Sequence, residues 1–269
     1  MYLGASNLYL SMPLPIDTLL LLFLGFFVIA TLYSSVGFGG GSSYLALLAL
    51  VLANFFAIRS LALVCNLVVV SGSLFWYIKK ANVNLKAFLP FVITSIPLAF
   101  LGASFKLKEE VFFIILGTTL SISASFLIWQ TFAVTRQNSK IRTYPTYLSY
   151  LLGGGIGLLS GLVGIGGGIF LAPLLHHLNW GKSVKIAALA SFFILVNSIS
   201  GITGLILNTT FIIPWKETLI LAVAVFLGGQ LGIRLSLKKF SARKIKLITA
   251  ILVLMVGIRV LLVNGLKLL

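Results

Sequence analysis

The chain has 269 residues, of which 59% are hydrophobic and only 9% charged, and its mean hydropathy is +1.14. An average soluble domain carries roughly 25% charged residues, so this composition excludes a soluble globular protein. The net charge of +16 would favour a nucleic-acid partner in a soluble protein, but here the basic residues lie in short connections between apolar segments, where they orient the chain and contact lipid. We therefore expect an all-α integral membrane protein that binds no nucleic acid.

Apolar stretches of about 20 residues, enough to span a hydrocarbon layer of roughly 30 Å, recur along the chain. In the first half, an apolar arm from Pro15 to Ser35 ends at the glycine cluster Gly37-Phe38-Gly39-Gly40-Gly41, and a second arm runs from Tyr44 to Leu52. The 12 residues from Ser42 to Ala53 make about 18 Å of helix, too short to cross alone. Three helices of spanning length are expected next, at Ile58 to Ile78, Lys86 to Ser104 and Val111 to Thr135.

The second half repeats this plan after a polar stretch at 136–145. Two arms, Thr146 to Val163 and Ile169 to Leu178, flank a second glycine cluster, and three spans follow at Ser183 to Leu207, Trp215 to Leu235 and Ala242 to Leu262. At a fixed offset of 127 positions, glycines at 37, 39, 40, 41 and 102 match glycines at 164, 166, 167, 168 and 229. This register predicts internal duplication, with a first membrane repeat at 1–135, a basic connecting loop at 136–145 and a second membrane repeat at 146–269.

The basic residues predict how each half lies in the membrane. If each glycine-broken segment enters and returns on the same side, 14 of the 20 Lys and Arg residues share one side, which the positive-inside tendency makes cytoplasmic. Each half then has three full crossings plus a hairpin, so the two halves insert in opposite senses. We expect a multi-pass protein of the cell inner (plasma) membrane with cytoplasmic basic loops. Inverted repeats with broken helices are typical of secondary transporters that work by alternating access.

The two glycine clusters are the candidate binding site. Each leaves backbone N–H groups free at the start of the next half-helix, where the helix dipole adds about half a positive charge, so two facing ends would hold an anion. Polar side chains on neighbouring segments would add donors. The candidate substrate-binding residues are Gly37, Gly39, Gly40, Gly41, Ser42, Ser43, Asn66, Gly164, Gly166, Gly167, Gly168, Ser191 and Asn197. Two alternatives stay open: the glycines only permit tight helix packing, and the asparagines only join helices.

The other titratable residues argue against catalysis and against a metal. The four carboxylates, Asp17, Glu109, Glu110 and Glu217, lie near predicted helix ends, which leaves no buried acid as a proton relay or cation ligand. Arg59 and Arg259 begin and end spans, where we expect their side chains to snorkel to the interface. We therefore expect no catalytic residue, no metal, no cofactor and no enzyme activity. The lipid-facing apolar surface does not define an oligomeric state.

The duplicated Gly-x-Gly-Gly-Gly pattern resembles the TauE/SafE family of sulfite and organosulfonate exporters, also called toluene sulfonate uptake permeases. The resemblance covers nearly the whole chain, and in the second half Gly164 to Gly168 is followed by Pro173, as in the family. The first half departs from the pattern, because Ala46 stands at the position that matches Pro173. The resemblance implies transport of a small sulfur-containing or related organic anion. A passive anion channel built on the same broken helices is the alternative.

Overall fold

The computed structural model describes residues 14–35, 37–52, 54–81, 85–133, 141–237 and 242–268, which form helices and turns, with no strand in these ranges. Seven of the described helices are long and apolar enough to cross a membrane. They are α2 (Ile16–Ser35), α4 (Phe55–Ala81), α5 (Leu89–Ser104), α6 (Glu109–Ala133), α7 (Thr146–Val163), α9 (Ser183–Leu207) and α10 (Trp215–Leu237). The expected all-α integral membrane fold is confirmed. Residues 1–13 of the predicted first repeat and 136–140 of the predicted connecting loop lie outside the described residues.

Two short helices follow the glycine clusters. They are α3 (Gly41–Ala49) and α8 (Gly168–His177), and each begins at the last glycine of its cluster rather than after it. The arms were expected from Tyr44 and from Ile169, so both helices begin earlier than predicted. Glycine fits in their first turns, where neighbouring side chains leave no room for a Cβ. A 3-10 turn, η1 (Leu85–Phe88), precedes α5.

The last membrane segment differs from the expected single helix. It begins as α11 (Ala242–Arg259) and continues as a π-helical segment, η2 (Val260–Gly265). The change in winding coincides with a close approach to α6, where a Cβ on Gly117 would lie 2.7 Å from the Cβ of Leu261.

The packed pairs of α-helices have counterparts in the bundle: moving both helices of a pair by 127 positions along the sequence gives a packed pair. The most extensive contacts join α5 to α7 and α10 to α2, and these two pairs correspond to each other. The same holds for α5 with α9 and α4 with α10, and for α8 with α9 and α3 with α4. The pairs α4 with α9 and α6 with α11 correspond to themselves. Both most extensive contacts therefore connect one half of the chain to the other.

Glycines let the paired helices approach closely. On α7, a Cβ at Gly157 would lie 2.6 Å from the Cα of Ser95 on α5, and Cβ atoms at Gly153 and Gly161 would meet the backbone carbonyls of Phe91 and Ala99. On α10, Gly228 and Gly232 approach the backbone of α2 in the same way. These glycines therefore serve tight helix packing, the usual role of small residues in membrane helices.

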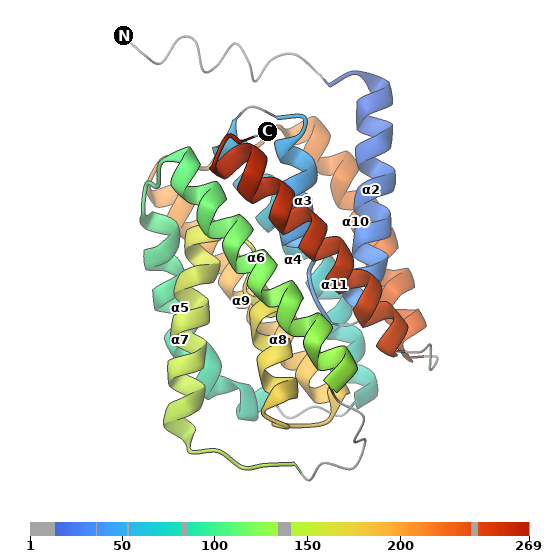
Figure 1. Ribbon diagram of the computed structural model, residues 1–269, viewed down its shortest axis with the longest axis vertical. Coiled ribbons are helices and arrows are strands. Elements are labelled where there is room, and N and C mark those ends of the chain that lie inside the picture. The colour runs from blue at the N-terminus through green and yellow to red at the C-terminus, as the bar shows by residue number, and fades with distance from the viewer. Residues whose placement is uncertain are drawn as a thin grey trace.

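The two hairpins enter the bundle from opposite ends. In Figure 1, α2 begins at the upper end and α3 lies in the upper half, whereas α7 begins at the lower end and α8 lies in the lower half. Helix α4, which packs on α3, and helix α9, which packs on α8, also contact each other. Of the spanning helices, these two have the largest fraction of buried residues. Polar residues are buried along both, including Asn66 on α4 and Ser191, Asn197 and Ser198 on α9. The core of the bundle therefore contains hydrogen-bonding groups as well as apolar ones.

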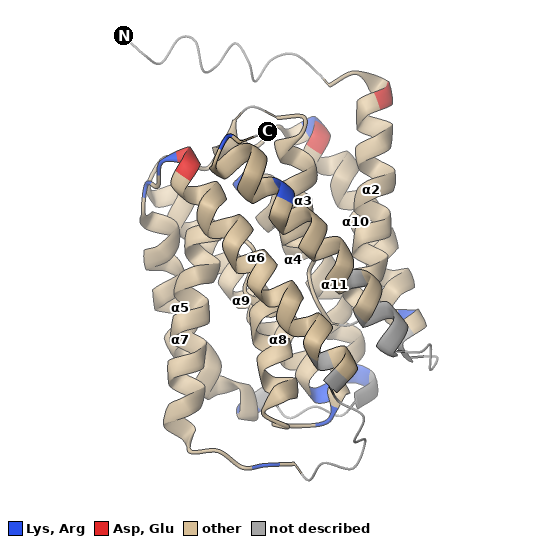
Figure 2. Ribbon diagram, viewed as in Figure 1, with Lys and Arg blue, Asp and Glu red and all other residues tan. Residues whose placement is uncertain are grey.

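Charged residues collect at the two ends of the bundle. The first turns of α2, α6 and α10 carry Asp17, Glu109, Glu110 and Glu217, which are all the acidic residues of the chain. These three helices begin at the upper end, and Figure 2 shows acidic residues there and none at the lower end. Lys and Arg residues of the described segments occur at both ends. The lower end is therefore purely basic among the described residues.

Candidate functional site at the two helix breaks

The first break separates α2 from α3 by a turn that only glycine adopts easily. Gly37 and Gly40 have φ angles of 85° and 88°, in the left-handed region that side chains disfavour. Gly40 is the residue before α3, and no side chain among the described residues caps the helix there. The N–H groups of Gly41 and Ser42 lie in the first turn, where no acceptor exists within the helix. The break thus presents amide donors at the positive end of a helix dipole.

The second break has the same construction. Gly164 ends α7 with a φ of 77°, Gly166 has a φ of 75°, and Gly167 precedes α8 with a φ of 80°. The start of α8 likewise has no side-chain cap from the described part of the chain. Two uncapped helix N-termini are therefore present, one from each half.

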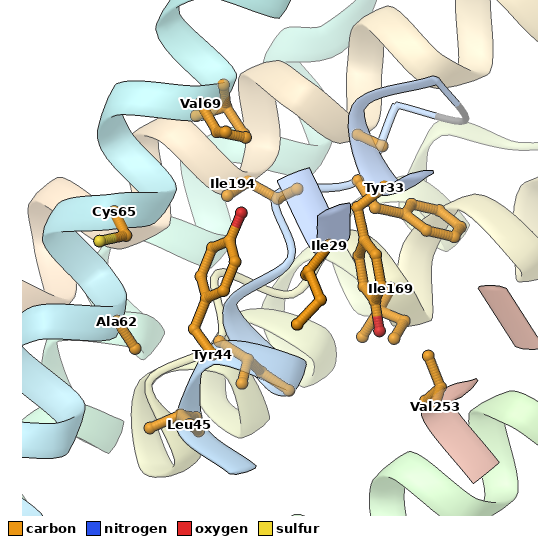
Figure 3. Packing of buried hydrophobic residues seen from close by; sticks show 14 of the residues in the cluster. Ile29, Tyr33, Tyr44, Leu45, Ala62, Cys65, Val69, Ile169, Ile194 and Val253 are labelled. Carbon is orange, nitrogen blue, oxygen red and sulfur yellow. The ribbon is translucent and has the colours of Figure 1, made fainter. Parts of the chain in front are cut away.

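Both breaks reach the same side chain, Ile194 of α9. A Cβ at Gly39 would lie 3.2 Å from the Cγ2 of Ile194, and a Cβ at Gly166 would lie 2.6 Å from the same atom. Gly168 also packs on Ile194, through its Cδ1. Figure 3 shows Ile194 beside the turn between α2 and α3. The two tips are adjacent, and they are covered by protein, because the described residues of both glycine clusters are buried.

Asn66 of α4 faces the first break directly. A Cβ at Gly39 would lie 2.5 Å from its Oδ1, and a Cβ at Gly41 would collide with its Nδ2. The side chain is fully buried, and neither polar atom of its amide has a hydrogen-bond partner among the described residues. An amide in an apolar interior without partners costs roughly 1–3 kcal/mol, so its presence at this position needs a reason.

Buried hydroxyls without partners lie near the second break. Ser198 Oγ lies 3.2 Å from the position of a Cβ at Gly166, and Ser160 Cβ lies 3.1 Å from that of a Cβ at Gly167. Both hydroxyls, and the amide of Asn197, which is 1% exposed, have no hydrogen-bond partner within the described segments. Ser160 is not among the residues predicted from the sequence. Its place four residues before Gly164, in the last turn before the second break, is the signal that could have found it.

Three candidate residues are already engaged in this structure. Ser43 Oγ lies 2.6 Å from the Tyr33 hydroxyl and Ser42 Oγ lies 3.4 Å from it, so both serines bond across the first hairpin. Ser191 Oγ donates to the carbonyl of Gly37 at 3.3 Å, which ties the first break to α9.

A further polar group that the sequence analysis missed is Tyr44 of α3. Its hydroxyl is buried with no hydrogen-bond partner in the described part of the chain, and it lies 2.8 Å from the position of a Cβ at Gly40. The ring stacks on Phe26 with centroids 4.5 Å apart. In Figure 3 the hydroxyl points toward Ile194. The signal in the sequence was its place one turn into the half-helix, since helical side chains lean back toward the N-terminus.

Arg59 departs from the expectation that it snorkels. It lies in the first turns of α4, but its side chain is only 1% exposed, because α6 and α7 cover it. Its Nη2 donates to the carbonyl of Gly161 at 2.8 Å, and its guanidinium carbon lies 5.5 Å from the centre of the Phe112 ring. Arg259, in contrast, is exposed. No group of three or more His, Cys, Asp or Glu residues in the described segments could hold a metal ion.

The fold and these breaks define a class: a multi-pass helical membrane protein in which one glycine-broken hairpin from each half reaches a common point in the core. The chain belongs to the sulfite exporter TauE/SafE family, whose model matches residues 21–260. The family resemblance drawn from the glycine pattern is thus confirmed. The chain is also 32% identical over 245 residues to a curated protein of Sinorhizobium fredii (strain NBRC 101917 / NGR234), "Probable membrane transporter protein y4hK"; the match covers 88% of this chain and 96% of the relative. No solved structure matches the chain.

Proposed function

We propose that this protein is a transporter of a small anion, a sulfite-like oxyanion or a sulfonate, and that it works by alternating access. The observation that carries the proposal is the meeting of two uncapped helix N-termini at Ile194, with the unpartnered amide of Asn66 directed at one of them. Amide N–H groups and helix dipoles favour negative ligands. The family, and the name of the Sinorhizobium relative, support transport.

We further propose that residues 1–135 and 146–269 are inverted repeats. The exchange of helix contacts between the halves and the entry of the two hairpins from opposite ends both support this relation. Because α2 packs mainly on α10 and α7 on α5, each moving body combines helices from both halves. Opening to either side then means that one hairpin, with its partner helix, moves away from α4 and α9.

The described conformation is closed around the breaks, since Gly39, Gly166, Asn66 and Asn197 are all buried. The burial of these residues fits an occluded intermediate of the transport cycle, in which the ligand is closed off from both sides of the membrane. For orientation, we propose that the purely basic end faces the cytoplasm of a cell whose inner membrane holds the protein, following the positive-inside tendency.

The proposal is tested by one substitution with a matched control. Gly39→Ala places a Cβ 2.5 Å from Asn66 Oδ1, so it displaces the amide at the site. Gly155→Ala makes the same chemical change on α7, where a Cβ meets nothing within 4 Å. Uptake of radiolabelled sulfite into proteoliposomes should be lost in the first variant and retained in the second. Equal uptake by both would reject the site, and a steady unitary current across a bilayer would favour the channel instead of a carrier.

A further inference from the structure

Arg59 is a buried cation without an acidic partner. The four carboxylates of the chain lie in the first turns of α2, α6 and α10, and the ion pair within the described segments joins Glu110 to Lys267. Glu109 and Glu110 begin the helix that carries Phe112, but both are exposed. An ionised side chain inside the bilayer is expensive and normally serves a function or has a counter-charge. No side chain of the described structure supplies that counter-charge.

Capping of α7 accounts for only part of the arrangement. Donation from Nη2 to the Gly161 carbonyl places the guanidinium at the C-terminal end of α7, where a cation is favourable. Nε, however, is buried with no partner in the described segments, and it lies 3.5 Å from the position of a Cβ at Gly164, in the second break. A cap needs a donor, not a full charge. For the first hairpin the counterpart of Arg59, 127 positions further on, is Ile186 of the second half, and α2 ends without a basic residue in its last turn.

Arg59 and Asn66 lie on one face of α4. They are seven positions apart, which is close to two helical turns, or roughly 10 Å along the axis. Asn66 contacts the first break and Arg59 contacts the second. Ala62, fully buried and small, lies between them. The helix therefore holds Arg59 about two turns from Asn66, in a protein interior that screens its positive charge weakly.

We propose that Arg59 is the residue that makes the site selective for a negative ligand, the bound anion serving as its counter-charge. This assignment rests on the proposed function. For an anion bound at Asn66, the roughly 10 Å spacing along α4 and an effective dielectric constant of about 20 mean that one unit charge changes the binding constant of a monovalent anion by roughly 10- to 20-fold. A neutral ligand of the same shape gains nothing from the charge. Arg59 thus acts as a specificity-determining residue.

The test compares ligands that differ in charge but hardly in shape, using sodium methanesulfonate and neutral methanesulfonamide on the purified full-length protein. Binding is measured by isothermal titration and by the ligand-induced rise in melting temperature. Arg59→Gln removes the charge and keeps a donor for the Gly161 carbonyl, and Arg59→Lys keeps the charge. Arg259→Gln is the matched control, since it removes an exposed arginine from another helix end.

The wild-type protein and the Arg59→Lys and Arg259→Gln variants should prefer methanesulfonate over methanesulfonamide, and Arg59→Gln should lose roughly 10- to 20-fold of that preference. Equal loss of affinity for both ligands, or an unchanged preference, would overturn the assignment and leave Arg59 as a structural cap. If the wild-type protein binds none of methanesulfonate, sulfite or thiosulfate, the proposed function itself fails. Should Arg59→Gln not fold, loss of the preference in Arg59→Met decides in favour of the assignment and its retention decides against it.

Discussion

Replacing Asn66 with leucine should make the protein more stable and less active at the same time. Leucine has the same branched shape but puts methyl groups where the amide has its oxygen and nitrogen. Both amide atoms are buried without partners in the described structure, so the change removes a desolvation cost of roughly 1–3 kcal/mol. It also removes the amide N–H donors that would hydrogen-bond a bound anion.

The stability change is measured as the melting temperature of the ligand-free protein in detergent, followed by tryptophan fluorescence. A gain of 1 kcal/mol corresponds to about 2–4 °C for a domain of 150–250 residues, so a rise of several degrees is expected. Binding of methanesulfonate should weaken by more than about tenfold, since a hydrogen bond to a charged group contributes roughly 1.5–3 kcal/mol.

Ser73→Ala is the control for this experiment. Ser73 is buried on the same helix, but its hydroxyl donates to the carbonyl of Val69 within α4, so binding should not change. If Asn66 only joined helices, Asn66→Leu would lower the melting temperature and leave binding intact. That result would refute the reasoning from its unpartnered amide.

Three further outcomes are expected. Gly157→Ala should lower the melting temperature strongly, because its Cβ would lie 2.6 Å from the α5 backbone, whereas Gly155→Ala should raise or preserve it. Tyr33→Phe should cost about 1 kcal/mol by removing a 2.6 Å hydrogen bond to a serine of α3, measured by chemical denaturation, and no loss would mean that the bond is absent in solution. In a background with the lone cysteine replaced, an impermeant thiol reagent on intact cells should label Lys216→Cys and not Lys182→Cys; the reverse pattern would invert the proposed orientation.

The helices and the breaks could be predicted from the sequence because their causes are local. An apolar run of spanning length can only be a helix in lipid, and the bounds of α7 and α9 agree with the sequence analysis. Glycines at 37, 40, 164, 166 and 167 adopt positive φ angles, which explains why that residue type marks the breaks.

The surroundings of the breaks could not be predicted, because they depend on residues far away in the chain. Arg59 looks like a snorkelling residue at a helix start until Gly161 and Phe112, from two other helices, bury it. The partners of Ser42 and Ser43 are similarly invisible in the sequence, since Tyr33 reaches them only when the break folds α3 back along α2. Convergence on Ile194 requires the tertiary arrangement of both hairpins and α9.

The exchange of partners between the halves has a consequence for biosynthesis. When α2 leaves the ribosome, the helix on which it packs most, α10, is still about 180 residues from being made. Ile194 of α9, on which the first glycine turn packs, is likewise made only with the second half of the chain. Two fragments of the gene, cut within the connecting loop, should therefore yield a working protein only when a single cell makes both, and each fragment alone should be degraded.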